Sequence, residues 1–228
     1  MCGICGIVEF DGKIVQPRTV HRMADTLWHR GPDDAGYHLE AGVGLGHRRL
    51  SIIDVKSGQQ PLANEDQRIW VIFNGEISNH VESRSGLESK GHIFRTNSDT
   101  KVIVHLYEQM GEDCFAQLHG MFAVALWDGQ RRQLVLAHDR IGKKPLFYHC
   151  DRSRLIFGSE LKAVAAGNDS VFNLDPTALS DYCTFLYIPA PKSIYQEIRK
   201  APAAYYVVFS EHGVRQVRLH NCNVESVT

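Results

Sequence analysis

Cys2 is the residue best placed for nucleophilic chemistry, because it becomes the first residue once Met1 is removed. A free α-amino group titrates at about pH 8, so an N-terminal cysteine carries a general base beside its own thiol. The plain alternative is a small residue at a frayed chain end. Cys2 and Cys5 also form a C-x-x-C pair. A zinc site would need a second close pair of ligands, and a redox pair would open a helix, whereas this pair lies in an apolar, strand-like run.

Asn74 and Gly75 could present two hydrogen-bond donors at one spot. They follow the apolar run 69–73, where we expect a strand to end, and glycine permits a close approach to the backbone. An Asn-Gly pair is equally typical of a hairpin turn, so its spacing alone leaves both interpretations open.

Eight motifs in a fixed order place these residues in a larger pattern. They are MCGICGI (1–7), HRGPDD (29–34), GHRRLSIID (46–54), FNGEISNH (73–80), TNSDTKVI (96–103), GMFAVALWD (120–128), DRIGKKPLFY (139–148) and FGSELKA (157–163). Together they resemble the class II, or N-terminal nucleophile, glutamine amidotransferases. The sequence is most similar to the glutaminase half of asparagine synthetases and of their relatives in polysaccharide gene clusters, over roughly residues 1–200.

The resemblance implies an α+β fold, a four-layer αββα sandwich of the N-terminal nucleophile hydrolase type, with Cys2 in a pocket between the sheets. Cys2 would be the nucleophile that hydrolyses the side-chain amide of L-glutamine to glutamate and ammonia through a thioester. Asn74 and Gly75 would form the oxyanion hole, in which one donor can lower the barrier by about 3 kcal/mol.

The resemblance also implies a clamp for the amino-acid head of glutamine. The guanidinium group of Arg49 would hold the α-carboxylate bidentately, while Asp99 and Glu76 would bind the α-ammonium group. Asp99, at the start of a helix, could also serve as an N-cap. The other substrate-binding positions are Leu50, Ser51, Ile52, Ile53, Asn74 and Gly75.

Some positions depart from the family pattern. Ser78 replaces an aromatic residue, Lys101 an acid and His138 an arginine. We expect these changes to affect the rim of the pocket. His29 is expected in a loop over the pocket, where a structural role fits as well as a catalytic one.

The SGGxDS loop with which the family's synthetase half binds ATP has no match here. The sequence therefore predicts a glutaminase domain over residues 1–218, a loose tail over residues 219–228, and no synthetase domain in this chain. No metal and no cofactor are expected, since ATP and Mg²⁺ would belong to the synthetase domain. That domain or a separate subunit is the expected ammonia-receiving partner, and a homodimer stays open.

Short apolar runs bounded by Gly, Asp, Asn or Lys predict the strands that must position these residues. Asp128 and Gly129 suggest a hairpin turn between two of them, which favours antiparallel sheets. The runs are 4–10, 43–53, 69–73, 121–127, 134–137, 146–148, 155–157 and, as the last, 205–209.

Helical periodicity marks fewer segments. An apolar stripe of Val20, Met23, Ala24 and Leu27 predicts one helix, and a second stripe over 102–110 predicts another. Capping residues set the expected ends: Ser98 and Asp99 before the second helix and Gly111 after it, Ser159 before a helix to 165, and Asp175 with Pro176 before a helix to 187.

Composition argues against several functions. The formal net charge is −1, from 25 basic and 26 acidic residues, so neither a nucleic-acid surface nor a polybasic membrane surface is expected. No apolar run approaches the roughly 20 residues that span a bilayer. The N-terminus lacks the basic region of a secretory signal, and six scattered cysteines suit a reducing, cytoplasmic location.

Two rival functions stay open. An N-terminal nucleophile acylase acting on another amide would lack the clamp of Arg49 and Asp99. A degenerate binding or regulatory module would be favoured by loss of Cys2 or of the Asn-Gly-Glu motif, and both are intact.

Overall fold

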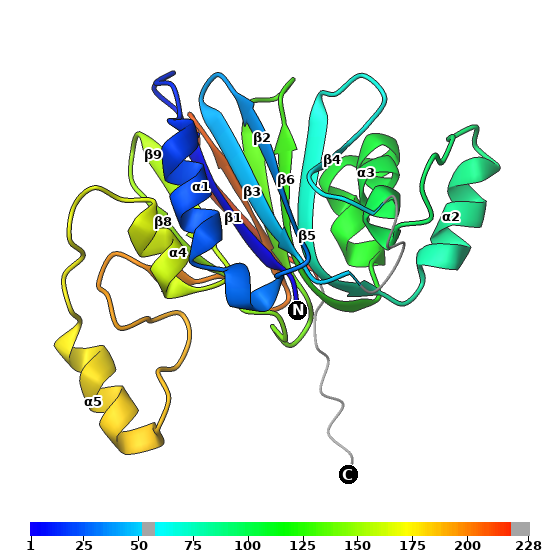
Figure 1. The fold of residues 1–228 in the computed structure, drawn as a ribbon. Coiled ribbons are helices and arrows are strands. Elements are labelled where there is room, and N and C mark those ends of the chain that lie inside the picture. The colour runs from blue at the N-terminus through cyan, green and yellow to red at the C-terminus, as the bar shows by residue number, and fades with distance from the viewer. Residues whose placement is uncertain (52–57, 220–228) are drawn as a thin grey trace, which may run out of the picture.

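The computed structural model describes residues 1–51 and 58–219, which form two stacked six-stranded antiparallel sheets (Figure 1). In the first sheet the strand order is β10-β8-β9-β1-β3-β2, and in the second it is β12-β11-β7-β6-β5-β4. The first contains β1 (Gly3–Glu9), β2 (Asp34–Glu40), β3 (Val43–Arg49), β8 (Phe147–Cys150), β9 (Arg154–Gly158) and β10 (Arg199–Lys200). The second contains β4 (Leu62–Ala63), β5 (Ile69–Ile77), β6 (Gly120–Asp128), β7 (Gln133–His138), β11 (Tyr205–Ser210) and β12 (Gly213–Arg218).

The alternation of side chains along β1 separates two hydrophobic cores. Ile4 and Val8 pack into the core between the two sheets. Cys5 and Ile7 point to the opposite face, where they pack with residues of α1 (Pro17–Asp25) and α4 (Leu161–Ala166). Because successive side chains of a strand point to opposite faces, Cys2, two residues before Ile4, has the inter-sheet orientation.

The second sheet repeats this arrangement on the other side of the molecule. Ile72 of β5 packs between the sheets, whereas Phe73 packs with residues of α2 (His80–Glu88) and α3 (Asp99–Met110). Helices therefore cover the outer face of each sheet, α1 and α4 on one side and α2 and α3 on the other (Figure 1). The predicted four-layer αββα sandwich is confirmed.

Several of the predicted helix ends are confirmed. The Ser98 hydroxyl caps α3 by accepting a hydrogen bond from the Thr100 N–H, and Gly111 follows the helix with a φ of 62°. Asp175 caps α5 (Pro176–Phe185). Two 3-10 helices, Trp28–Arg30 and Gly111–Gln117, complete the helical segments described. Within residues 1–51 and 58–219, no helix is long and apolar enough to cross a membrane.

Several boundaries differ from the predictions. β5 continues to Ile77 instead of ending at residue 73, because the polar residues after Phe73 stay paired with β6. Ser159 does not cap α4, because the N-cap of that helix is Glu160. The Ser159 hydroxyl instead accepts a hydrogen bond from the Ile4 N–H. Residues 220–228 of the predicted tail, together with Ile52 and Ile53, lie outside the described residues.

Some elements had no usable periodicity. Among the described residues the last strand is β12, which follows the predicted last run 205–209. It was not predicted, because β12 is mostly exposed and carries few apolar residues. In α2 only Leu87 is buried, so no apolar stripe marks that helix. The sequence did not predict β2 either, because its side chains are half-buried or exposed and form no apolar run.

Candidate active site

Cys2 is held at the edge of the inter-sheet space by contacts on both its sides. Its thiol donates to the Leu50 carbonyl oxygen at 3.7 Å, and its Sγ accepts from the Leu50 N–H at 3.4 Å. The Arg30 Nε donates to the Cys2 carbonyl oxygen at 3.0 Å, and the same guanidinium is paired with Glu160 at 2.9 Å. These contacts fix the backbone at the start of β1 while the sulfur faces a cavity.

Cys5 has a different environment three residues later. It is fully buried, its thiol donates to the Gly46 carbonyl oxygen at 3.6 Å, and burial raises its pKa to about 12. A thiol in that state is inert, because the thiolate is the nucleophilic form. Of the C-x-x-C pair, only Cys2 reaches a cavity.

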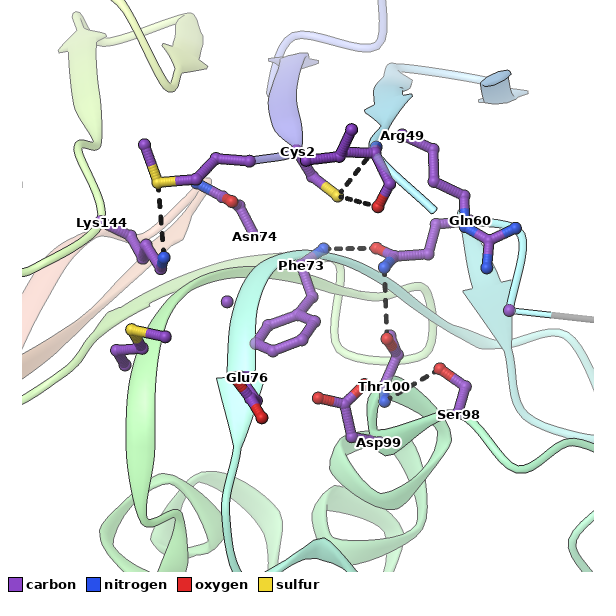
Figure 2. Close-up of a pocket in the computed structure, with 15 residues that line it drawn as sticks. Cys2, Arg49, Gln60, Phe73, Asn74, Glu76, Ser98, Asp99, Thr100 and Lys144 are labelled. Atoms are coloured by element: carbon purple, nitrogen blue, oxygen red, sulfur yellow. Dashed lines mark hydrogen bonds between the residues drawn. The ribbon is translucent and has the colours of Figure 1, made fainter. Parts of the chain in front are cut away.

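The cavity beside Cys2 has a volume of about 120 Å³, the space of a few water molecules, and so suits a small molecule. Figure 2 shows Cys2 and Asn74 on one side of it, with Glu76 and Asp99 across from them. Its lining contains Met1, Cys2, Arg49, Leu50, Gly58, Gln60, Phe73, Asn74, Gly75, Glu76, Ser98, Asp99, Thr100, Met121 and Lys144.

Most residues predicted for the site are therefore together. Ser51 is an exception: it is absent from the lining, and its N–H donates to Asp33 Oδ2 at 2.8 Å. Ile52 and Ile53 cannot be placed, since they lie outside the described residues. His29 lies outside the lining and pairs with Glu160 at 2.9 Å, which agrees with a structural role.

Two hydrogen-bond donors of β5 face the cavity. The Asn74 side chain is 1% exposed, and its Nδ2 has no hydrogen-bond partner among the described residues. The N–H groups of Phe73 and Ile77 donate to Gln60 Oε1 and Asp99 Oδ2 respectively. Because backbone N–H groups alternate across a strand, the Gly75 N–H points toward the same edge as these two.

This arrangement corrects the prediction that Asn74 and Gly75 stand where a strand ends. Both lie inside β5, opposite Ala123 and Phe122 of β6, and they form no hairpin turn. The donors can face a cavity because β4 pairs only with residues 70 and 71, so the following part of this strand edge is not covered by β4.

Charged residues surround the cavity at the ends of other elements. Arg49 is the last residue of β3 and Asp99 the first residue of α3, and each is 5% exposed. Burial raises the pKa of the Asp99 carboxyl group. Ser98, and not Asp99, is the N-cap. Arg48 points the other way and forms an ion pair with Asp25, as alternation along β3 requires.

Two residues that the sequence did not single out hold this region together. The Gln60 amide bridges β5 and α3, because its Oε1 accepts from the Phe73 N–H and its Nε2 donates to Thr100 Oγ1. His47 Nε2 donates to the Phe73 carbonyl oxygen at 3.3 Å, and burial lowers the His47 pKa to about 4. Gln60 lies outside the eight motifs, whereas His47 lies within one and could have been considered.

The site combines a thiol, two inward donors, a guanidinium and two carboxylates around a small cavity. Such a set can bind a compound with one carboxylate and one ammonium group and hold a carbonyl carbon next to sulfur. Among the described residues, Cys2 is not part of a cluster of metal-ligating side chains. Cys5, the nearest cysteine in the sequence, points into the core under α1 and α4.

Comparisons with known proteins agree with this geometry. A family model described as "Glutamine amidotransferase domain" matches residues 1–220. The chain is 39% identical over 232 residues to asparagine synthetase [glutamine-hydrolyzing] 3 of Bacillus subtilis, covering 100% of this chain and 38% of that protein. It is 43% identical over 168 residues to asparagine synthetase [glutamine-hydrolyzing] 3 of Arabidopsis thaliana, covering 72% of this chain and 28% of that one.

A solved structure shares the fold. Glutamine phosphoribosylpyrophosphate amidotransferase from B. subtilis superposes with a TM-score of 0.71 at 19% identity, covering 96% of this chain and 49% of that chain. The chain spans well under half the length of each of the two asparagine synthetases named above.

Proposed function

Because the chain belongs to the glutamine amidotransferase domain family, in its class II branch related to the glutaminase region of asparagine synthetases, we propose that it hydrolyses the side-chain amide of L-glutamine. The products are glutamate and ammonia. One observation carries the proposal: Cys2, Asn74 and Gly75 all line one small cavity. Asn74 Nδ2 has no hydrogen-bond partner among the described residues and is available to a substrate.

In the proposed mechanism the Cys2 sulfur attacks the amide carbon, and the thiol proton passes to the α-amine of the same residue. The amide oxygen becomes an oxyanion that accepts hydrogen bonds from Asn74 Nδ2 and the Gly75 N–H. The tetrahedral intermediate collapses as the α-ammonium protonates the leaving nitrogen, which departs as ammonia. A water molecule then adds to the thioester carbon and gives a proton to the α-amine; the C–S bond breaks, glutamate leaves, and the amine returns that proton to the Cys2 sulfur.

The clamp of the proposal assigns a partner to each end of the amino-acid head. Arg49 holds the α-carboxylate, while Asp99 and Glu76 hold the α-ammonium group. This arrangement aims the side-chain amide at Cys2. Leu50 directly follows β3 and lines the cavity, so we assign it to the wall beside the substrate.

The proposal also includes a partner. We assign residues 1–218 to the glutaminase domain of a cytoplasmic asparagine synthetase-like system, in which an ATP-dependent synthetase domain or subunit receives the ammonia. The support is the whole-chain likeness to a much longer asparagine synthetase. The glutaminase reaction itself requires neither a metal nor a cofactor.

The test is the release of glutamate from glutamine by variants of the two neighbouring cysteines. Cys2→Ala should be inactive, because the nucleophile is gone. Cys5→Ala should keep most activity, because that sulfur is buried on the helix side of β1. Intact mass should show that active protein lacks Met1, since an acylated nitrogen cannot accept the thiol proton.

Equal loss of activity in both variants would falsify the mechanism. Activity in protein whose mass retains Met1 would exclude the α-amine as base. No glutamate release from correctly processed, folded wild type would instead favour a binding or regulatory module.

A further inference from the structure

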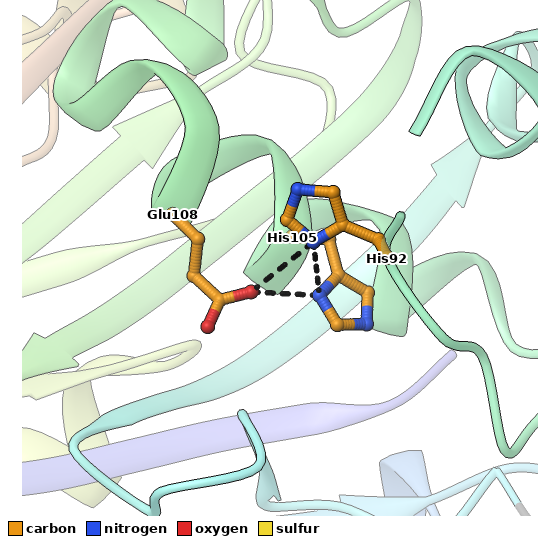
Figure 3. Close-up of side chains that lie close together, drawn as sticks. All are labelled: His92, His105 and Glu108. Carbon is orange, nitrogen blue, oxygen red and sulfur yellow. Dashed lines mark hydrogen bonds and ion pairs between the residues drawn. The ribbon is translucent and has the colours of Figure 1, made fainter. Parts of the chain in front are cut away.

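A second cluster of ligand-type side chains lies on the outer helix layer, outside the cavity of Cys2. His105 and Glu108 are three residues apart on α3 and so share one face of the helix, while His92 belongs to the connection between α2 and α3 (Figure 3). His105 Nδ1 is 3.1 Å from His92 Nδ1 and 2.7 Å from Glu108 Oε2, and His92 Nδ1 is 3.6 Å from Glu108 Oε2.

The groups around the two histidine rings favour protons on the outer ring nitrogens, so that two lone pairs and a carboxylate oxygen face one another in this triangle. Gln109 Oε1 lies 3.4 Å from His92 Nε2 and can accept its proton, which leaves the lone pair of His92 on Nδ1. Glu65 Oε1 faces His105 Nε2 at 3.9 Å and favours a proton on that nitrogen, which in the neutral ring leaves the lone pair of His105 on Nδ1, beside Glu108. A cation in the triangle lets both rings coordinate through Nδ1 and keep their protons on Nε2.

The distances suit a small divalent metal. Zn²⁺ binds histidine nitrogen and carboxylate oxygen at about 2.0–2.2 Å, and tetrahedral geometry then separates ligand atoms by about 3.3 Å. The three observed separations lie on both sides of that value. Figure 3 shows the two ring nitrogens and the carboxylate oxygen converging on one another.

We propose that His92, His105 and Glu108 form a Zn²⁺ site, with water in the fourth position. Neighbouring groups support the ligands in the way that outer-shell residues of metal sites do. Asn64 Nδ2 donates to Glu108 Oε1 at 2.9 Å, and Glu65 Oε1 lies 3.9 Å from His105 Nε2.

The charge balance permits a divalent ion. Lys101 is a cation on the same helix, but its ammonium group is already paired with Glu65 at 3.0 Å and donates to the Ala63 carbonyl oxygen at 2.7 Å. The metal would tie the α2–α3 connection to α3, whose first residue is Asp99. Its role is therefore structural, and it takes no part in the proposed hydrolysis.

The experiment is zinc titration of chelator-stripped protein, followed by calorimetry and by thermal unfolding. Wild type should bind one Zn²⁺ per chain and unfold at a higher temperature with zinc than without it. His92→Ala and Glu108→Gln should each lower the zinc affinity at least ten-fold, and both positions are exposed enough for the variants to fold. His212→Ala removes a highly exposed histidine from the β11–β12 turn and should change nothing.

The thiols need a separate control, because Zn²⁺ also binds cysteine. Cys2→Ala should retain the zinc affinity, and X-ray absorption of the loaded protein should show nitrogen and oxygen ligands without sulfur. Zinc affinity unchanged in His92→Ala and Glu108→Gln, a sulfur ligand, or no binding by wild type would each overturn the site. None of these readouts depends on glutaminase activity, so the proposed function can fail or succeed independently.

Discussion

At the scale of single residues, strand parity decides which cysteine can react. Cys2 and Cys5 differ by an odd number of positions, so they point to opposite faces of the first sheet. One sulfur reaches a cavity lined by polar groups, and the other is sealed among apolar side chains. A C-x-x-C spacing is typical of a metal or redox pair in the sequence. In this fold the same spacing places the two thiols on opposite faces of a sheet.

The clamp makes a second prediction at this scale. Arg49→Lys and Asp99→Asn should each lower kcat/KM for glutamine by roughly ten-fold or more. A planar guanidinium binds a carboxylate bidentately and an ammonium group does not, and an unpaired, desolvated partner typically costs about 2–5 kcal/mol. Steady-state kinetics of glutamate release would measure the effect.

The matched substrate is butyramide, which has an amide but lacks the α-amino and α-carboxylate groups. Wild type should hydrolyse it poorly, and Arg49→Lys should slow it far less than it slows glutamine. A mutation that slows both substrates equally would mean that Arg49 only supports the structure.

Much of this site follows from the sequence, because its reactive groups sit in short motifs. Cys2, Arg49, Asn74, Glu76 and Asp99 all line the cavity as predicted. Their supporting residues were not predicted. The Gln60 amide acts through contacts with Phe73 and Thr100, which belong to distant elements, and no local pattern encodes such contacts.

At the scale of elements, the part of β5 that β4 does not cover is what gives the cavity its backbone donors. The strand was expected to end where its apolar run ends, because a hydrophobic pattern marks burial better than pairing. Pairing with β6 carries it through Asn74 and Gly75 to Ile77. Helices with a clear apolar stripe, such as α1, were predictable, whereas α2, with one buried residue, was not.

Gly75 and Gly86 give a matched test of this edge. A Cβ on Gly75 would lie 2.2 Å from the Met121 carbonyl oxygen, so Gly75→Ala should destabilise the fold by about 1–3 kcal/mol as β5 and β6 move apart. Gly86 lies in α2 with nothing within 4 Å of such a Cβ, so Gly86→Ala should stabilise it by about 0.5–1 kcal/mol. Chemical denaturation measures both, and a stable Gly75→Ala protein would contradict the tight β5–β6 contact.

At the scale of the whole molecule, each of the two β-sheets supplies residues to the cavity of the proposed hydrolysis. The first sheet supplies Cys2, directly before β1, and Arg49, the last residue of β3. The second sheet supplies Asn74 and Gly75 from β5, and α3 adds Asp99. The layered fold thus brings the described groups of the proposed glutaminase site to one cavity. This chain covers only 38% of the asparagine synthetase [glutamine-hydrolyzing] 3 of Bacillus subtilis, and we propose that the ammonia is used by a synthetase domain or subunit outside the matched region.

This division of labour predicts how the isolated chain responds to ATP. Every group that the proposed hydrolysis needs lies around one cavity, and none of them requires a nucleotide or Mg²⁺. Purified chain should therefore release ammonia from glutamine at the same rate with and without ATP and Mg²⁺, and it should form no asparagine when aspartate is added. Coupled ammonia detection and amino-acid chromatography measure the two quantities. Asparagine formed without an added partner would reveal an adenylating site within these 228 residues, which the absence of an SGGxDS loop argues against.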